Sequence, residues 1–143
     1  MEKSITDINQ GKKLLSLGIY SKTADCHWYR QLCNWQGEKF KTPRPFVLSH
    51  EPWTKRGKMV QGFETFDEVP AWSISTLIGF LPARKWTLTM GGWDHNTGVF
   101  IPGDYFLTIL RDLDTEEPIV THAPGLLDAV VLALEELFPP QTP

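Results

Sequence analysis

The sequence predicts an α+β fold in which a small antiparallel sheet of three to four strands is covered by a C-terminal helix. β-rich runs over residues 86–90, 105–110 and 119–122 follow one another closely, and consecutive strands with short connections favour antiparallel pairing. A mostly apolar segment with helical periodicity, residues 126–138, comes next and can cover one face of that sheet. A chain of 143 residues is long enough for one such domain with a single core, residues 1–143.

The N-terminal part of the chain predicts two helices beside this sheet. Residues 4–17 carry an apolar stripe at helical spacing, and Gly18 is suited to the C-terminal stop. Gly11 in the middle weakens this helix by about 1 kcal/mol relative to alanine. A second, short helix is expected to run through Trp28 toward Leu32.

Residues 34–70 predict an irregular insertion rich in basic and aromatic side chains, because proline and glycine interrupt them and no periodicity is visible. One hairpin is expected inside it, with short strands at residues 46–48 and 58–60. Within residues 28–63, seven basic side chains face two acidic ones although the whole chain carries a net charge of −3. The seven are Arg30, Lys39, Lys41, Arg44, Lys55, Arg56 and Lys58.

A strong helix-start signal follows the insertion. Pro70 holds the incoming chain extended, and Ser73 is an N-cap residue that accepts a hydrogen bond from the first helical turn. Apolar residues at helical spacing predict a helix over residues 74–81, which Pro82 ends. Trp72 is expected to fold back on this helix as a hydrophobic staple, and the alternative is that its ring stacks on a ligand.

The predicted sheet has two turns with clear sequence signals. The strand that begins at Trp86 is expected to end at Gly91 and Gly92, and residues 94–98 are expected to form the tip of a hairpin. The acidic residues 112–118 predict the next turn, in which exposed carboxylates remain solvated.

The final helix, residues 126–138, is apolar around more than one face. Leu132 falls on the strip that Asp128 and Glu135 share. Such a helix is either buried on more than one side or packs against a second copy of itself, so a homodimer through this helix is one expectation. Residues 139–143 contain three prolines and are expected to form a frayed tail.

Composition limits the class of protein. A hydrophobic content of 41% is typical of a globular domain, and no apolar run approaches the roughly 20 residues that a membrane helix requires. The first residues carry no apolar signal segment, so the expected location is cytoplasmic. Two cysteines are too few for a disulfide scaffold, and Cys26 and Cys33 are expected to be reduced thiols.

Metal ligation receives little support from the sequence. Cys26, His27, Cys33 and His50 are competent zinc ligands, but their spacing matches no standard zinc knuckle. Residues 94–98 lack the correctly placed glycine and the bidentate glutamate of a calcium loop. We therefore expect neither a metal ion nor another cofactor.

Catalysis is likewise not indicated. The chain has no strained Gly-x-Ser-x-Gly turn that would present a nucleophile, and no glycine-rich loop that would hold a phosphate. The sequence therefore favours a non-catalytic binding protein that acts on a protein or a small ligand. A small hydrolase or a metal-dependent enzyme is the third alternative.

Nucleic-acid binding through residues 28–63 is the second alternative, because positive charges hold phosphates and interleaved aromatic rings stack on bases. Expected exposure at a helix start, a hairpin tip and a basic loop selects the candidate contact residues. These are Trp72, Trp93, Arg44, Lys55 and Arg56.

Three separated blocks, which together span about half the chain, resemble a group of small uncharacterised proteins. The blocks are Gly11–Gly18 with Thr23-Ala24-Asp25, the more specific Pro70-Ala71-Trp72-Ser73-Ile74-Ser75-Thr76-Leu77, and Leu127-Asp128-Ala129-Val130. The group occurs in phages and mobile elements of gut Bacteroidales. The resemblance implies an accessory protein of viral or mobile-element origin that acts on a host protein or a small ligand. It implies no mechanism and assigns no catalytic residue.

Overall fold

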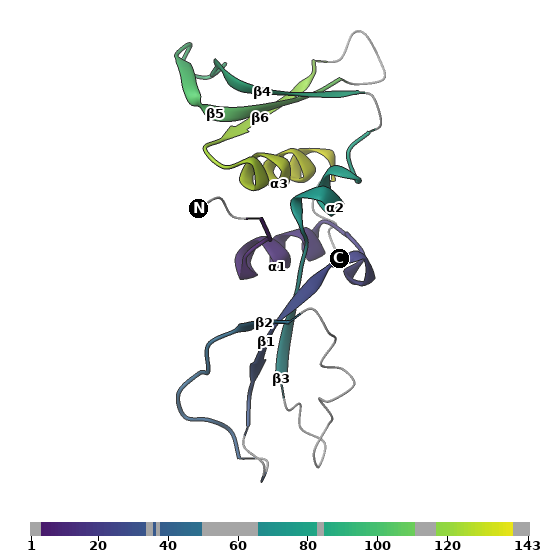
Figure 1. Cartoon of the computed structure of the whole chain (residues 1–143), viewed down its shortest axis with the longest axis vertical. Helices are drawn as coiled ribbons and strands as arrows, with labels where there is room; N and C mark the ends of the chain where they lie inside the picture. The colour runs from purple at the N-terminus through teal and green to yellow at the C-terminus, as the bar shows by residue number, and fades with distance from the viewer. Residues whose placement is uncertain are drawn as a thin grey trace.

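The computed structural model describes residues 4–33, 36, 38–49, 66–82, 85–110 and 117–138. It confirms the α+β class, but the described residues form two three-stranded antiparallel sheets where the sequence predicted one. The sheet at one end of the molecule has the order β4-β5-β6, from Trp86–Trp93, Phe100–Ile109 and Ile119–Ala123 (Figure 1). The second sheet has the order β2-β1-β3, from Val47–Ser49, Cys26–Gln31 and Phe66–Ala71, and lies at the opposite end.

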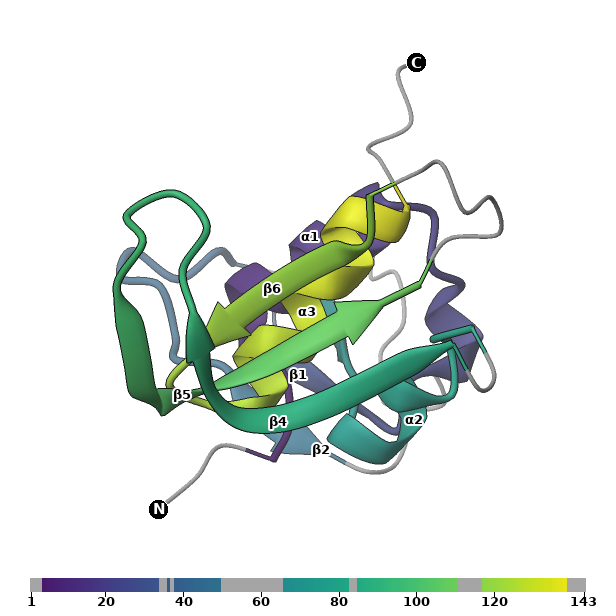
Figure 2. The same cartoon turned by 90° about the horizontal axis from the view of Figure 1, so that it is seen from above.

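Helix α3, Leu126–Leu137, covers the inner face of the β4-β5-β6 sheet, as the sequence predicts. Its other side packs against α1, Ile8–Ser16, and α2, Ile74–Ile78, so that α3 lies between the sheet and the two helices (Figures 1 and 2). Burial on two sides explains why the helix is apolar around most of its circumference. The apolar pattern therefore gives no independent support for a dimer.

Strand β4 does not end at the paired glycines, contrary to the prediction. It continues to Trp93, and the pairing with β5 shifts between Met90 and Gly92. Gly91 has φ +85°, a left-handed conformation that L side chains rarely adopt. The glycines therefore bend the strand within the hairpin, and they do not terminate it.

Helix α1 begins later than the sequence predicts, because Asp7 and Gln10 form a capping box. The Asp7 carboxylate accepts from the Gln10 amide at 2.8 Å, and the Gln10 side chain accepts from the Asp7 amide at 3.1 Å. Residues before the cap are extended, and Ile5 forms an antiparallel bridge with Ser73. The N-terminal segment thereby joins the α2 region.

Helix α2 begins as predicted, with Ser73 as the N-cap that accepts a hydrogen bond from the Thr76 amide. It is shorter than expected, because its regular part ends at Ile78 and a turn continues to Leu81. The carboxylate of Asp25 reinforces the cap, since it accepts from the Ser73 amide at 2.7 Å and from the Thr76 hydroxyl at 2.9 Å.

The prediction of a second short helix running through Trp28 is wrong. After a single turn of 3-10 helix at Ser21–Thr23, the chain forms strand β1, whose neighbours β2 and β3 pair with it on both sides. The β-favouring side chains of Trp28 and Tyr29 agree with this state, and cross-strand pairing outweighs a weak helical pattern. The prediction that residues 34–70 are irregular is also wrong at its end, because residues 66–70 belong to strand β3.

The expected strand at residues 46–48 corresponds to β2, one residue later. Its partner at residues 58–60 and the tail at residues 139–143 lie outside the residues that the structure describes. Among the described helices, none is both long enough and apolar enough to cross a lipid bilayer.

Candidate functional site

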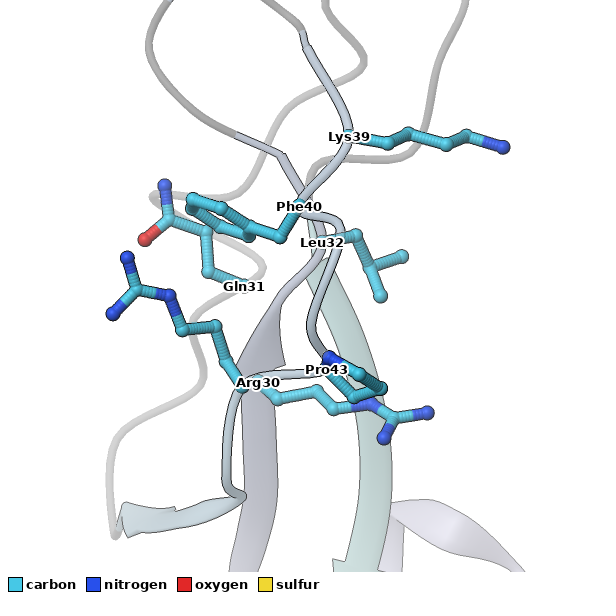
Figure 3. A pocket seen from close by; sticks show the side chains of 7 residues that line it. Arg30, Gln31, Leu32, Lys39, Phe40 and Pro43 are labelled. Atoms are coloured by element: carbon cyan, nitrogen blue, oxygen red, sulfur yellow. The ribbon is translucent and has the colours of Figure 1, made fainter.

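A basic and aromatic pocket of about 230 Å³ lies where the chain leaves β1 and turns toward β2. The Phe40 amide donates to the Leu32 carbonyl at 3.1 Å, and Cys33 and Lys39 form an antiparallel bridge, so the connection folds back along the end of the strand. This local pairing brings β1 residues beside residues about ten positions later. The lining is Arg30, Gln31, Leu32, Lys39, Phe40, Pro43 and Arg44 (Figure 3).

Two arginines of this region each lie over a phenyl ring. The guanidinium carbon of Arg44 is 4.4 Å from the centroid of Phe40, and that of Arg30 is 4.5 Å from the centroid of Phe46. At these distances the ring face attracts the cation and holds its plane in place. Lys39 extends away from Phe40, so its charge lies at the rim of the pocket (Figure 3).

Arg30 is held from two sides. Its Nη2 lies 3.1 Å from Oδ2 of Asp67 on β3, and the two residues are direct cross-strand partners. Its Nε is buried and has no hydrogen-bond partner among the described residues. A buried donor without a partner is unusual in a folded protein, and it marks Arg30 as a position that packing alone does not explain.

The predicted contact residues have different outcomes. Arg44 is exposed and lies at the pocket, and Trp93 at the end of β4 is 64% exposed. The expected exposure of Trp72 is wrong, because its side chain is 0% exposed and its Nε1 donates to the Thr23 hydroxyl at 2.9 Å. Its packing among the helices and β5 removes it from any surface. Lys55 and Arg56 lie outside the described residues.

The four candidate metal ligands do not form a site in the part of the chain that the structure describes. Cys26 begins β1 and Cys33 follows its end, and a strand rise of about 3.3 Å per residue keeps the two thiols far apart. Burial raises the pKa of the Cys26 thiol, and the negative charge of Asp25 adds to this. His27 lies 3.9 Å from Glu68 across the sheet, and His50 is not among the described residues.

A second cluster of polar side chains was not found by sequence reasoning. On the outer face of the β4-β5-β6 sheet, Nδ1 of His122 lies 2.8 Å from Oδ2 of Asp104, and its Nε2 lies 3.8 Å from Oδ2 of Asp94. The three residues come from β6, β5 and the β4–β5 turn and are separated by up to 28 positions. No short motif could reveal them. Alternation along β6 could only place His122 on the outer face, because the hydroxyl of its neighbour Thr121 donates to the Ala129 carbonyl of α3 on the inner face.

Asp94 has a second role in this cluster because it closes its own turn. Its Oδ1 accepts from the Asn96 amide at 2.9 Å, and its backbone carbonyl accepts from the Gly98 amide at 2.8 Å. The Asn96 amide is the main cause that lowers the pKa of Asp94, with the Thr97 side chain and the positive form of His122 acting in the same direction. The sequence predicted a hairpin tip at residues 94–98, which the structure confirms, but it did not indicate that Asp94 meets His122.

Comparison of the chain with protein families, with curated proteins and with solved structures gives no match. No group of three or more histidine, cysteine, aspartate or glutamate side chains in the described ranges is arranged to hold a metal ion.

Proposed function

We propose that this protein is a non-catalytic binding protein, and that the pocket at the end of β1 takes single-stranded nucleic acid. The observation that carries the proposal is the pair of guanidinium groups at a pocket, each with its carbon about 4.5 Å from the centre of a phenyl ring, Arg44 over Phe40 and Arg30 over Phe46. Arginine planes and aromatic rings are the surfaces on which unpaired bases stack.

Size and charge favour this ligand class. A cavity of about 230 Å³ is smaller than the roughly 300–1,000 Å³ typical of sites that enclose a drug-sized molecule. It suits one base or one phosphate group of a longer chain. Lys39 and Arg44 are exposed in its lining, Lys41 is exposed next to Phe40 in the chain, and Arg30 lines the pocket while paired with Asp67.

The acidic balance of the whole chain does not oppose this proposal. Near 0.15 M salt, charges more than about 8 Å apart on the surface are largely screened, so the local arrangement decides the attraction. The acidic residues Asp94 and Asp104 lie on the other sheet, at the opposite end of the molecule from the pocket (Figure 1).

Fluorescence anisotropy with a labelled oligo-dT tests the proposal. If three to four phosphates are neutralised, the logarithm of the affinity should fall with the logarithm of salt concentration with a slope of about −2 to −3. An abasic oligonucleotide of equal length separates charge from stacking, and it should bind at least about fivefold more weakly for each stacked base it lacks.

Variants locate the site. Arg44→Gln should weaken binding and reduce the salt slope by about 0.7, whereas Phe40→Leu should weaken oligo-dT and leave the abasic strand unaffected. Lys12→Gln, which removes one exposed cation from α1, is the matched control and should change neither the affinity for oligo-dT nor the salt slope. Absence of binding at low salt would reject the proposal.

A host protein as the partner, the expectation that follows from the resemblance to phage and mobile-element proteins, stays a prediction. An acidic protein surface would also depend on Arg44 and on salt, but it would not distinguish oligo-dT from the abasic strand. Equal displacement of both oligonucleotides by an acidic peptide, with no preference for bases, would favour that alternative.

A further inference from the structure

The outer face of the β4-β5-β6 sheet carries a group that nucleic-acid binding does not use. Phe106 and His122 are direct cross-strand partners on β5 and β6, and their rings are stacked with centroids 4.6 Å apart at an angle of 13°. Although Phe106 faces away from α3, it is only 4% exposed. The hairpin covers it, because a Cβ atom at Gly92 would lie 2.8 Å from the Phe106 ring.

Two neighbouring contacts therefore hold the β4–β5 hairpin against the outer face of the sheet. Gly92 touches Phe106, and the carboxylate of Asp94 faces His122. Seen from above, the turn curls beside the end of β6 (Figure 2). Trp93 lies between these two contacts and packs edge-on against Phe100, with ring centroids 5.2 Å apart.

The number of protons on His122 decides how many of its neighbours it can bind. A carboxylate only accepts, so the 2.8 Å contact with Asp104 requires the proton of the neutral imidazole on Nδ1. The Nε2 lone pair then faces the second carboxylate, Asp94, and offers it no hydrogen. A second proton places an N–H and a positive charge between the two carboxylates.

We propose that His122 is a proton-operated latch, which in its charged form ties the β4–β5 turn to the outer face of the sheet and in its neutral form releases it. The exposed Trp93 directly precedes the turn and packs against Phe100, so the latch sets how firmly these two side chains are held at the surface. The device is separate from the basic pocket and does not depend on what that pocket binds.

The surroundings of the imidazole agree with a two-state device. Among the described residues, the charged groups at ion-pair distance are Asp104 from β5 and Asp94 from the β4–β5 turn. The lowered pKa of Asp94 keeps its carboxylate ionised at every pH at which an imidazole ordinarily changes charge.

Solvent exchange of the Asp94 and Gly98 amides, measured by NMR and corrected for intrinsic rates, reports directly on the turn. The Asp94 amide donates to the Val99 carbonyl at 2.9 Å, and the Gly98 amide donates to the Asp94 carbonyl at 2.8 Å, so both amides exchange only when the turn opens. The fraction of time the turn is open should fall by about fivefold from pH 8 to pH 5.5, the effect of one partly exposed ion pair. An equal opening at both pH values would overturn the proposal.

Three variants assign the effect. Asp94→Asn keeps an acceptor for the Asn96 amide but removes the charge, and it should abolish the pH dependence while the turn still forms. His122→Asn removes the titrating group, keeps a side-chain donor for Asp104, and should abolish it as well. His95→Gln, in the same turn and exposed, is the matched control and should retain it. Loss of the pH dependence in the control, or its persistence in Asp94→Asn, rejects the latch.

Discussion

The two sheets have the same number of strands and the same antiparallel pairing, yet they differ in what holds them. The β4-β5-β6 sheet has one face against α3 and contributes Leu107, Ile109 and Ile119 to the main apolar core. In the β2-β1-β3 sheet, polar side chains meet across strands, as Arg30 does with Asp67 and His27 with Glu68, and none of the buried residues described for this sheet joins that core.

This difference shows how one chain separates stability from recognition. Buried apolar area contributes most of the folding free energy, and it is concentrated between the β4-β5-β6 sheet and the helices. The other sheet can then expose guanidinium groups and rings at its end without weakening the core. Four predictions test this division.

The largest effect is expected at the centre of the core. Trp72→Ala should lower the free energy of unfolding by about 3–5 kcal/mol, because it removes a fully buried ring and its hydrogen bond to Thr23. Trp93→Ala, which removes the same side chain from an exposed site, should change it by less than about 0.5 kcal/mol. Urea denaturation followed by circular dichroism measures both, and similar losses would refute the contrast.

The next effect is expected where α1 meets β3. An alanine Cβ at Gly11 would lie 2.8 Å from Val69 Cγ1 and closer still to the Pro70 carbonyl oxygen. Gly11→Ala should therefore destabilise the protein by about 1–3 kcal/mol, although alanine is the better helix former. Gly103→Ala, where an added Cβ meets nothing within 4 Å, is the control. A stabilised Gly11→Ala variant would show that the helix and strand can separate.

A smaller effect concerns the cap of α2. Partial burial raises the pKa of Asp25, but the hydrogen bonds from Ser73 and Thr76 outweigh it and leave the pKa below its ordinary value of 3.8. The carboxylate therefore adds stability above that pH, and the contribution is lost as the pH falls through the lowered pKa. Asp25→Ala should lower the free energy of unfolding by about 1 kcal/mol at pH 7.

The difference in the free energy of unfolding between Asp25→Ala and the unmodified protein should shrink when urea denaturation is repeated below pH 3.8. Glu136→Ala, which removes an exposed carboxylate from α3, is the charge control and should change stability by less than about 0.5 kcal/mol. A difference for Asp25→Ala that stays constant from pH 7 to pH 3 would contradict a cap formed by the ionised side chain.

The smallest effect is expected in the β2-β1-β3 sheet. A double-mutant cycle with Arg30→Gln and Asp67→Asn should give a coupling energy of about 0.2–1 kcal/mol, because both side chains are about one-third exposed. The same Arg30→Gln variant should weaken binding of oligo-dT. A coupling as large as the loss at Trp72 would place this ion pair among the main stabilising contacts.

The sequence predicted the elements whose signals are local. Strand runs, the Ser73 cap and the apolar final helix depend on periodicity and on residues within one turn, and the structure confirms them. Strand β1 was missed because its state depends on pairing with β3, some 40 positions later. The basic segment was found from its composition, and the described part of it does line a pocket, but the pairing of each arginine with its ring depends on the fold.

By itself the sequence determined the α+β class, the Ser73 cap of α2, and the unequal distribution of charge, since each follows from neighbouring side chains. Only the tertiary structure decided that Trp72 is fully buried and Trp93 exposed, because neighbouring residues do not fix which elements pack over a ring. It also brought Asp94, Asp104 and His122 together. Strand register sets such contacts between residues far apart in the chain, and a short motif carries no record of register.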